Sequence, residues 1–282
     1  MNTFGLHTFA IAPVWDLDLI EPQMERLKGL GIGLLEIPLL RPEEIDTKRT
    51  RAFAERWNVE LIPSLGLPAS LDVVARPDEA LAFLEPAFGV CEAVGSAALG
   101  GVTYGTIGKT SGRAPTEQEI DGMCRFLVRA AKAATAHGLK LGIEPCNRYE
   151  THLLNTSSQA LAFLELLDEP NVTIHLDTYH MNIEEKGIGQ GFRSTAKHCA
   201  YVHLSESDRG VPGTGTIDWD EIFRTLADIG FKGRLVVESF VTLPPEIAAA
   251  LSVWRPVARD RQEVLARGVP FLKGLARVHG LV

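Results

Sequence analysis

The chain has 282 residues, of which 45% are hydrophobic and 23% charged, a balance typical of a folded globule rather than of a disordered or collagen-like chain. The formal net charge is −8 and no run of Lys and Arg is present, which argues against a nucleic-acid partner because such proteins gather basic residues against phosphates. The N-terminus lacks a basic segment before an apolar stretch, and no run approaches the ~20 apolar residues that cross a bilayer. We therefore expect a cytoplasmic protein without a membrane partner.

Eight short apolar runs predict the strands of a parallel sheet covered on both faces, because they do not alternate with polar residues. Segments with helical spacing lie between them, and Gly31, Gly95, Gly138 and Gly230 stand where a helix should end before the next strand. Eight such units in a chain of this length predict a single closed (β/α)8 TIM barrel over residues 1–282. The predicted strands are residues 4–10, 33–39, 60–65, 97–104, 140–145, 172–176, 200–204 and 234–239.

A doubly wound open sheet is the alternative architecture for a chain in which strands and helices alternate. It is disfavoured because no G-x-G-x-x-G motif follows the first predicted strand, where a dinucleotide-binding fold would have it. The Gly-rich piece at residues 210–216 is too short to separate two domains. We therefore expect one domain.

The C-terminal segment from about residue 245 has a helical pattern, with Pro256 and Pro270 as expected breaks. It carries more apolar residues than one capping helix needs, so we expect these helices to serve in packing or in oligomerisation as a homodimer or homotetramer. The surplus residues are Leu251, Val253, Trp254, Leu265, Phe271, Leu272 and Leu275.

Polar side chains interrupt the ends of four consecutive predicted strands, where the reactive groups of a (β/α)8 barrel lie. Burying three carboxylates together is costly unless a cation neutralises them, so we expect one divalent metal ion per chain. Oxygen ligands with one imidazole and no thiolate favour Mn²⁺, Mg²⁺ or Co²⁺ over structural zinc. The four residues are Glu144, Asp177, His203 and Glu238.

Two further histidines lie on predicted strands. His175 precedes Asp177 by two residues and therefore points to the same side, one layer deeper, where we expect a hydrogen-bonded core histidine. His7, at the end of the first strand, either touches substrate or lines the barrel. No G-x-S-x-G motif is present, so covalent catalysis by a serine is disfavoured.

Five strings in the chain resemble the ketose 3-epimerases, which include D-tagatose, D-psicose (allulose) and L-ribulose 3-epimerases among the xylose-isomerase-like barrels. The resemblance runs across the whole chain and is strongest in its C-terminal half. It departs in the loop after the fourth strand, which lacks a tryptophan found in some members, and beyond residue 248. The strings are Glu144-Pro-Cys-Asn-Arg-Tyr-Glu150, Leu176-Asp-Thr-Tyr-His-Met-Asn-Ile-Glu-Glu185, His203-Leu-Ser-Glu-Ser-Asp-Arg209, Trp219-Asp-Glu-Ile-Phe223 and Val237-Glu-Ser-Phe240.

The resemblance implies an isomerase that inverts C3 of free ketoses of the D-tagatose, D-psicose/D-fructose or L-ribulose type. It implies one divalent ion, with Mn²⁺ expected first and Co²⁺ or Mg²⁺ as alternatives, held by Glu144, Asp177, His203 and Glu238. Glu144 and Glu238 would also be the acid/base pair. The substrate contacts expected on the same grounds are Glu150, His180 and Arg209, to which we add His7 and Phe240.

Elementary chemistry leads to a compatible reaction. A proton next to a ketone is removed at neutral pH only if the developing enediolate is stabilised, and a metal ion does this as a Lewis acid. Inversion then needs an acid/base group on each face, which two carboxylates on different strands provide. A single base on one face would suit an isomerase instead.

Three other functions stay open. Related barrels include hydroxypyruvate-isomerase-like and aldose isomerases and inosose-type dehydratases, which also use carboxylates at strand ends. A nuclease of the endonuclease IV type would need several zinc ions and a basic groove, which the net charge disfavours, and a sugar-binding barrel would have little use for four ligands. The number of metal ions per chain distinguishes the epimerase, with about one, from the nuclease, with about three.

The phosphorylation state of the sugar is a separate question. Residues 210–216 follow the seventh strand, where backbone amides commonly bind phosphate in such barrels. The resemblance is to enzymes of free sugars, and Arg209 is the only cation in that loop. We therefore expect an unphosphorylated ketose as the small-molecule partner.

Overall fold

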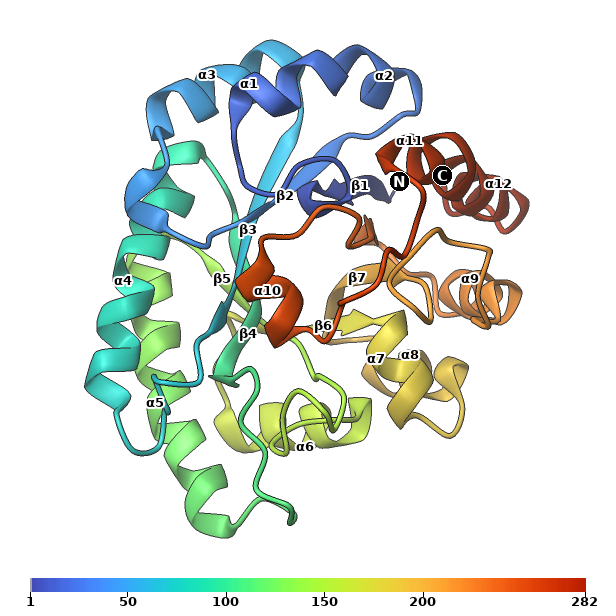
Figure 1. Ribbon diagram of the computed structural model, residues 1–282. Coiled ribbons are helices and arrows are strands. Elements are labelled where there is room, and N and C mark those ends of the chain that lie inside the picture. Colours follow the sequence, from blue (N-terminus) through green and yellow to red (C-terminus); the bar gives the residue numbers. More distant parts are fainter. Residues whose placement is uncertain (1) are drawn as a thin grey trace.

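The computed structural model describes residues 2–282 and is a closed barrel of eight parallel strands (Figure 1). The strands follow one another in chain order, and β8 pairs with β1 to close the barrel. The predicted (β/α)8 barrel is thereby confirmed, and the open sheet is excluded. The strands are Thr3–His7 (β1), Leu34–Pro38 (β2), Glu60–Leu67 (β3), Ala98–Thr106 (β4), Lys140–Ile143 (β5), Val172–Asp177 (β6), Cys199–Ser205 (β7) and Arg234–Glu238 (β8).

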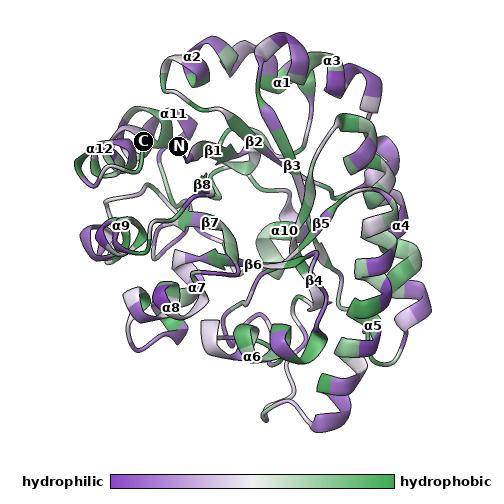
Figure 2. Ribbon diagram, turned by 180° about the vertical axis from the view of Figure 1, so that it is seen from behind, coloured by the Kyte–Doolittle hydropathy of each residue, from purple (hydrophilic) through white to green (hydrophobic). Residues whose placement is uncertain are grey.

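Helices form a ring around the strands (Figure 1), and their green apolar faces turn toward the barrel while purple polar faces turn outward (Figure 2). None of the helices within residues 2–282 is long and apolar enough to cross a membrane. The α-helices are Leu17–Ile20 (α1), Met24–Gly29 (α2), Thr47–Trp57 (α3), Pro77–Val94 (α4), Glu117–Ala136 (α5), Ser157–Leu167 (α6), Thr178–Glu184 (α7), Ile188–Thr195 (α8), Trp219–Asp228 (α9), Pro245–Ala250 (α10), Arg261–Glu263 (α11) and Val269–Val278 (α12).

Local sequence signals explain where several of the helices begin or end. Thr116 before α5 and Thr156 before α6 each form a capping box, in which the hydroxyl and a side chain three residues later satisfy the free backbone amides. The four glycines expected at helix ends all have positive φ, between 64° and 78°, a conformation that costs glycine little. Each helix is thereby turned back toward the next strand.

The barrel interior changes from apolar to polar along the strands. Leu34, Ile62, Tyr201 and Val236 pack together in the lower part of the barrel. Side chains two residues further along a strand point to the same side, so the layer above consists of Glu36, Ser64, His203 and Glu238. The apolar layer closes the barrel from below, and the polar layer forms the floor of a site at the carboxyl ends of the strands.

The C-terminal segment covers two different parts of the barrel. Helix α10 lies across the mouth of the barrel, whereas α12 packs on the outside near β1, where the two chain ends lie side by side (Figure 1). The Asn2 amide donates a hydrogen bond of 2.9 Å to the backbone oxygen of Leu281. Pro256 falls between α10 and α11, as expected.

The expected break at Pro270 is wrong. Arg261–Val278 is continuously helical, with a π-helical turn at Val264–Gly268 immediately before α12. Pro270 lies directly after this π turn, in the first turn of α12. The wider π turn shifts the hydrogen-bond register, since the Val269 amide bonds to the Val264 oxygen five residues back.

Most of the surplus apolar residues pack within the chain. Leu265 and Leu272 are buried in the core, and Leu251 lines the cavity at the barrel mouth. Trp254 remains 79% exposed and Phe271 40% exposed. The use of this segment in oligomerisation stays a prediction.

Candidate active site

The four predicted metal ligands converge at the carboxyl end of the barrel. His203 Nδ1 lies 3.2 Å from Glu144 Oε1, 3.4 Å from Glu238 Oε1 and 4.0 Å from Asp177 Oδ2. The side chains come from four neighbouring strands, because Glu144 directly follows β5 and the others lie on β6, β7 and β8. All four are buried. One ring nitrogen therefore faces three carboxylates in a small enclosed volume.

This donor set fits a divalent cation. The ligand atoms of Asp177, His203 and Glu238 lie within 4.8 Å of one another, as do those of Glu144, His175 and His203. Asp177 Oδ2 is buried without a hydrogen-bond partner among the described residues, and the nearest guanidinium nitrogen, Arg209 Nη1, is 3.9 Å away, beyond hydrogen-bond distance. A buried anionic oxygen of this kind is costly unless a cation approaches it more closely. Three carboxylates and one imidazole suit a hard or borderline divalent ion.

Burial also changes the acidity of these groups. It raises the pKa of Glu144 and of Glu238, since neither carboxylate is solvated. Burial by itself lowers the pKa of the His203 imidazole, but the surrounding carboxylates, Glu238 first among them, raise that pKa well above its ordinary value. Without a cation the site therefore retains protons, which metal binding must release.

One residue of the site was missed by the sequence analysis. Glu36, on β2, accepts a hydrogen bond of 2.6 Å from His203 Nε2 and one of 2.5 Å from the Tyr201 hydroxyl. Burial would raise the pKa of Glu36, but the charges of His203 and His7 and the hydrogen bond from His203 together outweigh burial and hold the pKa well below its usual value. Its signal was a carboxylate in the middle of the apolar run of the second strand, whereas the other four were identified at the ends of their runs.

Arg209 joins the metal-ligand group to the rest of the site. Its Nη1 lies 2.8 Å from Glu238 Oε2 and its Nη2 lies 3.2 Å from Glu150 Oε1. The guanidinium carbon lies 4.1 Å from the ring centre of Tyr179 and 4.5 Å from that of Phe240, in reach of cation–π attraction. The side chain is only 3% exposed, so Arg209 is not a solvated loop charge.

The backbone of Arg209 is held in an uncommon conformation. Its φ is +58°, in the left-handed region that costs a non-glycine residue about 1–3 kcal/mol. The Phe240 amide donates a hydrogen bond of 2.9 Å to the Arg209 oxygen, which ties the loop after β7 to the residues after β8. This tie directs the guanidinium toward Glu238.

His180 presents an N–H group to the same place. Its Nδ1 accepts a hydrogen bond of 3.0 Å from the Asn147 amide, which assigns the proton of the neutral ring to Nε2. Burial lowers the pKa of His180 well below its ordinary value, and the charge of Arg209 adds to this effect. Nε2 lies 3.1 Å from Arg209 Nη2, so two donors converge where a substrate oxygen could accept from both.

His7 and Phe240 both line the cavity. His7 Nδ1 accepts a hydrogen bond of 3.2 Å from the Phe9 amide, and the Phe240 ring meets the rings of His7 and Phe9 edge-on at 6.0 and 5.9 Å. The structure thus places both residues beside the predicted ligands. Their contact with substrate stays a prediction.

His175 is buried, as expected, but it is not hydrogen-bonded. Neither ring nitrogen has a hydrogen-bond partner among residues 2–282. The ring lies edge-on to Tyr201 at 4.5 Å and to His203 at 4.1 Å, and Nε2 is 4.0 Å from Glu144 Oε1. The expectation failed because the nearby Glu144 oxygen, at 4.0 Å, lies beyond hydrogen-bond distance.

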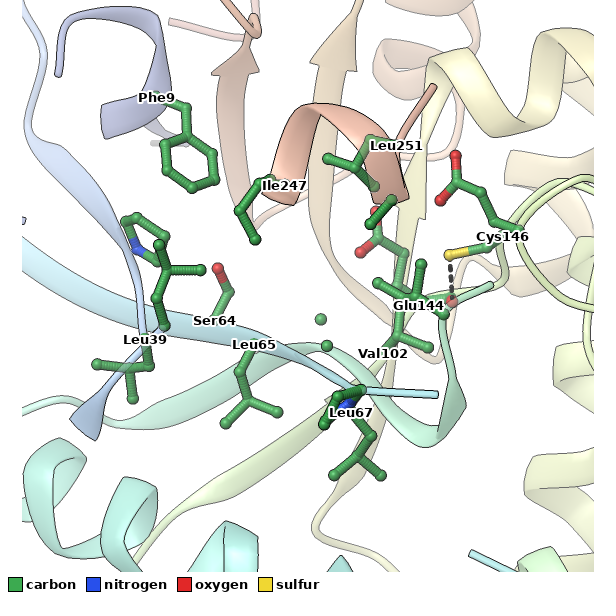
Figure 3. Close-up of a pocket in the computed structure, with 18 of the residues that line it drawn as sticks. Phe9, Leu39, Ser64, Leu65, Leu67, Val102, Glu144, Cys146, Ile247 and Leu251 are labelled. Atoms are coloured by element: carbon green, nitrogen blue, oxygen red, sulfur yellow. Dashed lines mark hydrogen bonds between the residues drawn. The ribbon is translucent and has the colours of Figure 1, made fainter. Parts of the chain in front are cut away.

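A cavity of about 620 Å³ opens above these residues. Its polar wall consists of the groups described above. Ile247 of α10 and Leu251, directly after that helix, point toward the cavity, opposite Leu65 and Leu67 of β3 (Figure 3). The other apolar lining residues include Leu39, Val102 and Ile107.

The Gly-rich loop after β7 already binds an anion, the carboxylate of Glu206. Glu206 accepts hydrogen bonds from the amides of Ser207, Gly213 and Ile217 at 2.8, 2.8 and 3.3 Å. The Trp219 indole N–H adds a fourth at 3.0 Å. These amides, which the loop's position made candidates for phosphate binding, are therefore directed at a side chain of the protein itself.

Comparisons with known proteins agree with this fold. Residues 24–257 match the family described as Xylose isomerase-like TIM barrel. The L-ribulose 3-epimerase of Methylomonas sp. (strain DH-1) is 36% identical over 96% of both chains. The ketose 3-epimerase of Arthrobacter globiformis is 34% identical over 95% of both chains.

Two solved structures are similar over nearly the whole chain. A structure of L-ribulose 3-epimerase has a TM-score of 0.94 at 29% identity and covers 99% of this chain and 96% of its own. The D-allulose 3-epimerase of Methylomonas sp. in complex with D-allulose has a TM-score of 0.90 at 31% identity, with 97% and 96% covered.

The fold and the family match place the chain among the xylose-isomerase-like TIM barrels. Within that class it belongs to the ketose 3-epimerase family, which makes it an enzyme of the isomerase class. The predicted family is thereby confirmed.

Proposed function

We propose that this enzyme inverts C3 of free ketoses by proton transfer between two carboxylates, Glu144 and Glu238. The observation that carries this proposal is that the two groups, from β5 and β8, approach the same His203 nitrogen at 3.2 and 3.4 Å. Because β5 and β8 are not neighbouring strands of the barrel, their carboxylates can lie on opposite faces of a flat substrate. An isomerase that moves a proton on one face would need only one of them.

The same residues would hold one divalent ion per chain, for which Mn²⁺ is our first expectation. Glu144, Asp177, His203 and Glu238 are its proposed ligands, and the unpartnered Asp177 oxygen supports this assignment. When bound, the ion would act as a Lewis acid that makes the C3 proton more acidic. Co²⁺ and Mg²⁺ are the alternatives.

The side chains of the site have separate proposed roles in the reaction. One of Glu144 and Glu238 removes the C3 proton, and the other, protonated, returns a proton to the opposite face of the planar enediolate. In the metal-free site, burial raises the pKa of both carboxylic acids. Arg209 and His180, with their N–H groups, and Glu150 are proposed to orient the sugar oxygens, and His7 and Phe240 to border the reacting carbons.

An unphosphorylated sugar is favoured by the loop after β7. Its amides are occupied by the carboxylate of Glu206, which would repel a phosphate. The wall opposite the polar residues, with Ile247 and Leu251, offers no cation. A free ketose is therefore the proposed small-molecule partner, in line with the D-allulose bound to one solved relative.

The cellular setting and assembly are proposed on the remaining observations. A single domain over residues 1–282 acting in the cytoplasm accords with the lack of a membrane-spanning helix in residues 2–282. A homodimer or homotetramer would cover the exposed Trp254 and Phe271 of the segment after residue 245.

A panel of free ketopentoses and ketohexoses, each beside a phosphorylated counterpart, tests this function. We expect C3 epimers of free ketoses as products, seen by NMR or chromatography. An aldose product, or a ketose phosphate turned over with a kcat/KM tenfold above every free ketose, would contradict it.

A further inference from the structure

Glu36 lies across the barrel from the strand that carries His203. β2 and β7 are not neighbours in the sheet, yet the Glu36 side chain spans the interior and its Oε2 lies 2.6 Å from His203 Nε2. The same oxygen accepts the Tyr201 hydroxyl at 2.5 Å. Only 1% of Glu36 is exposed, so solvent does not share in these contacts.

A carboxylate at this position is costly for the fold. Directly below it, Leu34 and Tyr201 belong to an apolar layer, and a buried ionised group is often replaced by an apolar one with no loss of stability. Its second oxygen, Oε1, has no hydrogen-bond partner among the described residues and lies 3.7 Å from His7 Nε2. Stability alone therefore does not account for a carboxylate here.

The two nitrogens of His203 face different surroundings. Nδ1 faces Glu144 and Glu238, whereas Nε2 faces Glu36. An ionised carboxylate only accepts hydrogen bonds, so the Glu36 contact requires a proton on Nε2. In a neutral imidazole this leaves the Nδ1 lone pair directed at the three carboxylates, where a cation would bind.

We infer that Glu36 is a positioning residue, which holds the His203 ring in the Nε2–H tautomer so that Nδ1 faces the metal ion. Carboxylates that accept from the far nitrogen of a metal-binding histidine fix the ring and typically change metal affinity 10–100-fold. This inference rests on the proposed function only in that it takes a divalent ion to bind at Nδ1. It assigns a role to β2, which supplies none of the proposed ligands.

The affinity of the full-length, metal-free protein for Mn²⁺, measured by calorimetry without sugar, tests the inference. We expect Glu36→Gln to bind Mn²⁺ about 10–100-fold more weakly than wild type, because a neutral amide no longer favours one tautomer. Tyr201→Phe is the matched control, since it removes the other donor to Glu36 but keeps the His203 contact. Its affinity should stay within about threefold of wild type.

A second readout separates positioning from a general structural role. At an Mg²⁺ concentration that saturates wild type, ¹⁵N NMR of the imidazoles should show His203 only in the Nε2–H form in wild type and Tyr201→Phe. In Glu36→Gln it should also show an Nδ1–H form from chains without the ion, because Nδ1 carries a proton only where no ion is bound to it. Glu36→Asp keeps the charge but shortens the side chain, so its Mn²⁺ affinity should lie between those of wild type and Glu36→Gln. It replaces Glu36→Gln as the test variant if that protein does not fold.

Wild-type affinity and tautomer in the folded Glu36 variant would overturn the inference. Equal losses of affinity in Glu36→Gln and Tyr201→Phe would overturn it too, since packing of the layer would then explain both. These measurements involve no sugar, so a loss of Mn²⁺ affinity in Glu36→Gln stands even if no ketose is epimerised. Wild-type Mn²⁺ affinity in Glu36→Gln would disprove only the role of Glu36 and would leave the proposed epimerase function unaffected.

Discussion

Single residues determine where charge gathers in this barrel. Glu36, His203 and Glu238 each lie two positions beyond a residue of the apolar layer below. Side chains two residues apart on a strand point to the same face, so a polar layer lies directly above the apolar one. The sequence predicted the convergence of the four proposed ligands because each interrupts the end of an apolar run. It did not predict the contact of Glu36 with His203, which depends on a path across the barrel interior.

Arg209 offers a test at this scale. Its two nitrogens join Glu238 to Glu150 at 2.8 and 3.2 Å, a fork that the single ammonium of lysine does not reproduce. Since a hydrogen bond to a charged group contributes about 1.5–3 kcal/mol, Arg209→Lys should lower kcat/KM for the preferred ketose by about 10- to 100-fold. Steady-state kinetics measure this loss.

Arg255→Lys is the control for Arg209→Lys. Arg255 is exposed and lies 3.9 Å from Asp208, an ion pair of the kind that contributes little. Its kcat/KM should stay within about twofold of wild type. The proposed role of Arg209 is wrong if the two variants are equally active.

At the scale of elements, local sequence signals predicted most boundaries. The capping boxes at Thr116 and Thr156 and the left-handed glycines act within a few residues, so they could be interpreted without tertiary contacts. The break at Pro270 was wrong because a π turn accommodates the proline. The placement of α10 over the mouth had no local signal, since it depends on the cavity beneath.

The loop after β7 supplies a second test. Glu206 accepts four hydrogen bonds there, and a glutamine oxygen can replace only part of them. We expect Glu206→Gln to lower the free energy of unfolding by about 2–3 kcal/mol at pH 7, measured by urea denaturation. Asp208→Asn, which changes a carboxylate that accepts one backbone amide at 3.0 Å, should have a smaller effect.

The effect of Glu206 should depend on pH. Burial raises the pKa of Glu206, but its hydrogen bonds outweigh burial and lower it below the ordinary value of 4.5. A lowered folded-state pKa stabilises the fold above the unfolded-state pKa and loses this contribution as pH falls through the folded-state pKa. The difference in the free energy of unfolding between wild type and Glu206→Gln should therefore become smaller as the pH is lowered from 5. A difference independent of pH would contradict this assignment.

For the whole molecule, the charge distribution agrees with a small, uncharged substrate. A net charge of −8 does not attract phosphates or nucleic acid. The enclosed negative charge is instead concentrated where a cation would bind. Composition could exclude partners, but it could not indicate which ketose fits, because the cavity is shaped by residues from β2, β3 and α10 that lie far apart in the sequence.

Metal content tests the molecule as a whole. We expect about one divalent ion per chain, loss of turnover on chelation and recovery on adding Mn²⁺ or Co²⁺, because three buried carboxylates need a cation to coexist. His203→Ala should bind the ion much more weakly. Metal analysis and activity after dialysis measure this, and full activity of the metal-free protein, or about three ions per chain, would contradict it.

Our central claim is that Glu144 and Glu238 act on opposite faces of the sugar, and deuterium incorporation at C3 in D₂O tests it most directly. In Glu144→Gln and Glu238→Gln, each first shown to retain metal, we expect slow labelling of one epimer without epimerisation. The remaining carboxylate takes and returns a proton on its own face, so the two variants should label opposite epimers. If either variant retains metal and still epimerises near the wild-type rate, one base serves both faces and the claim is wrong.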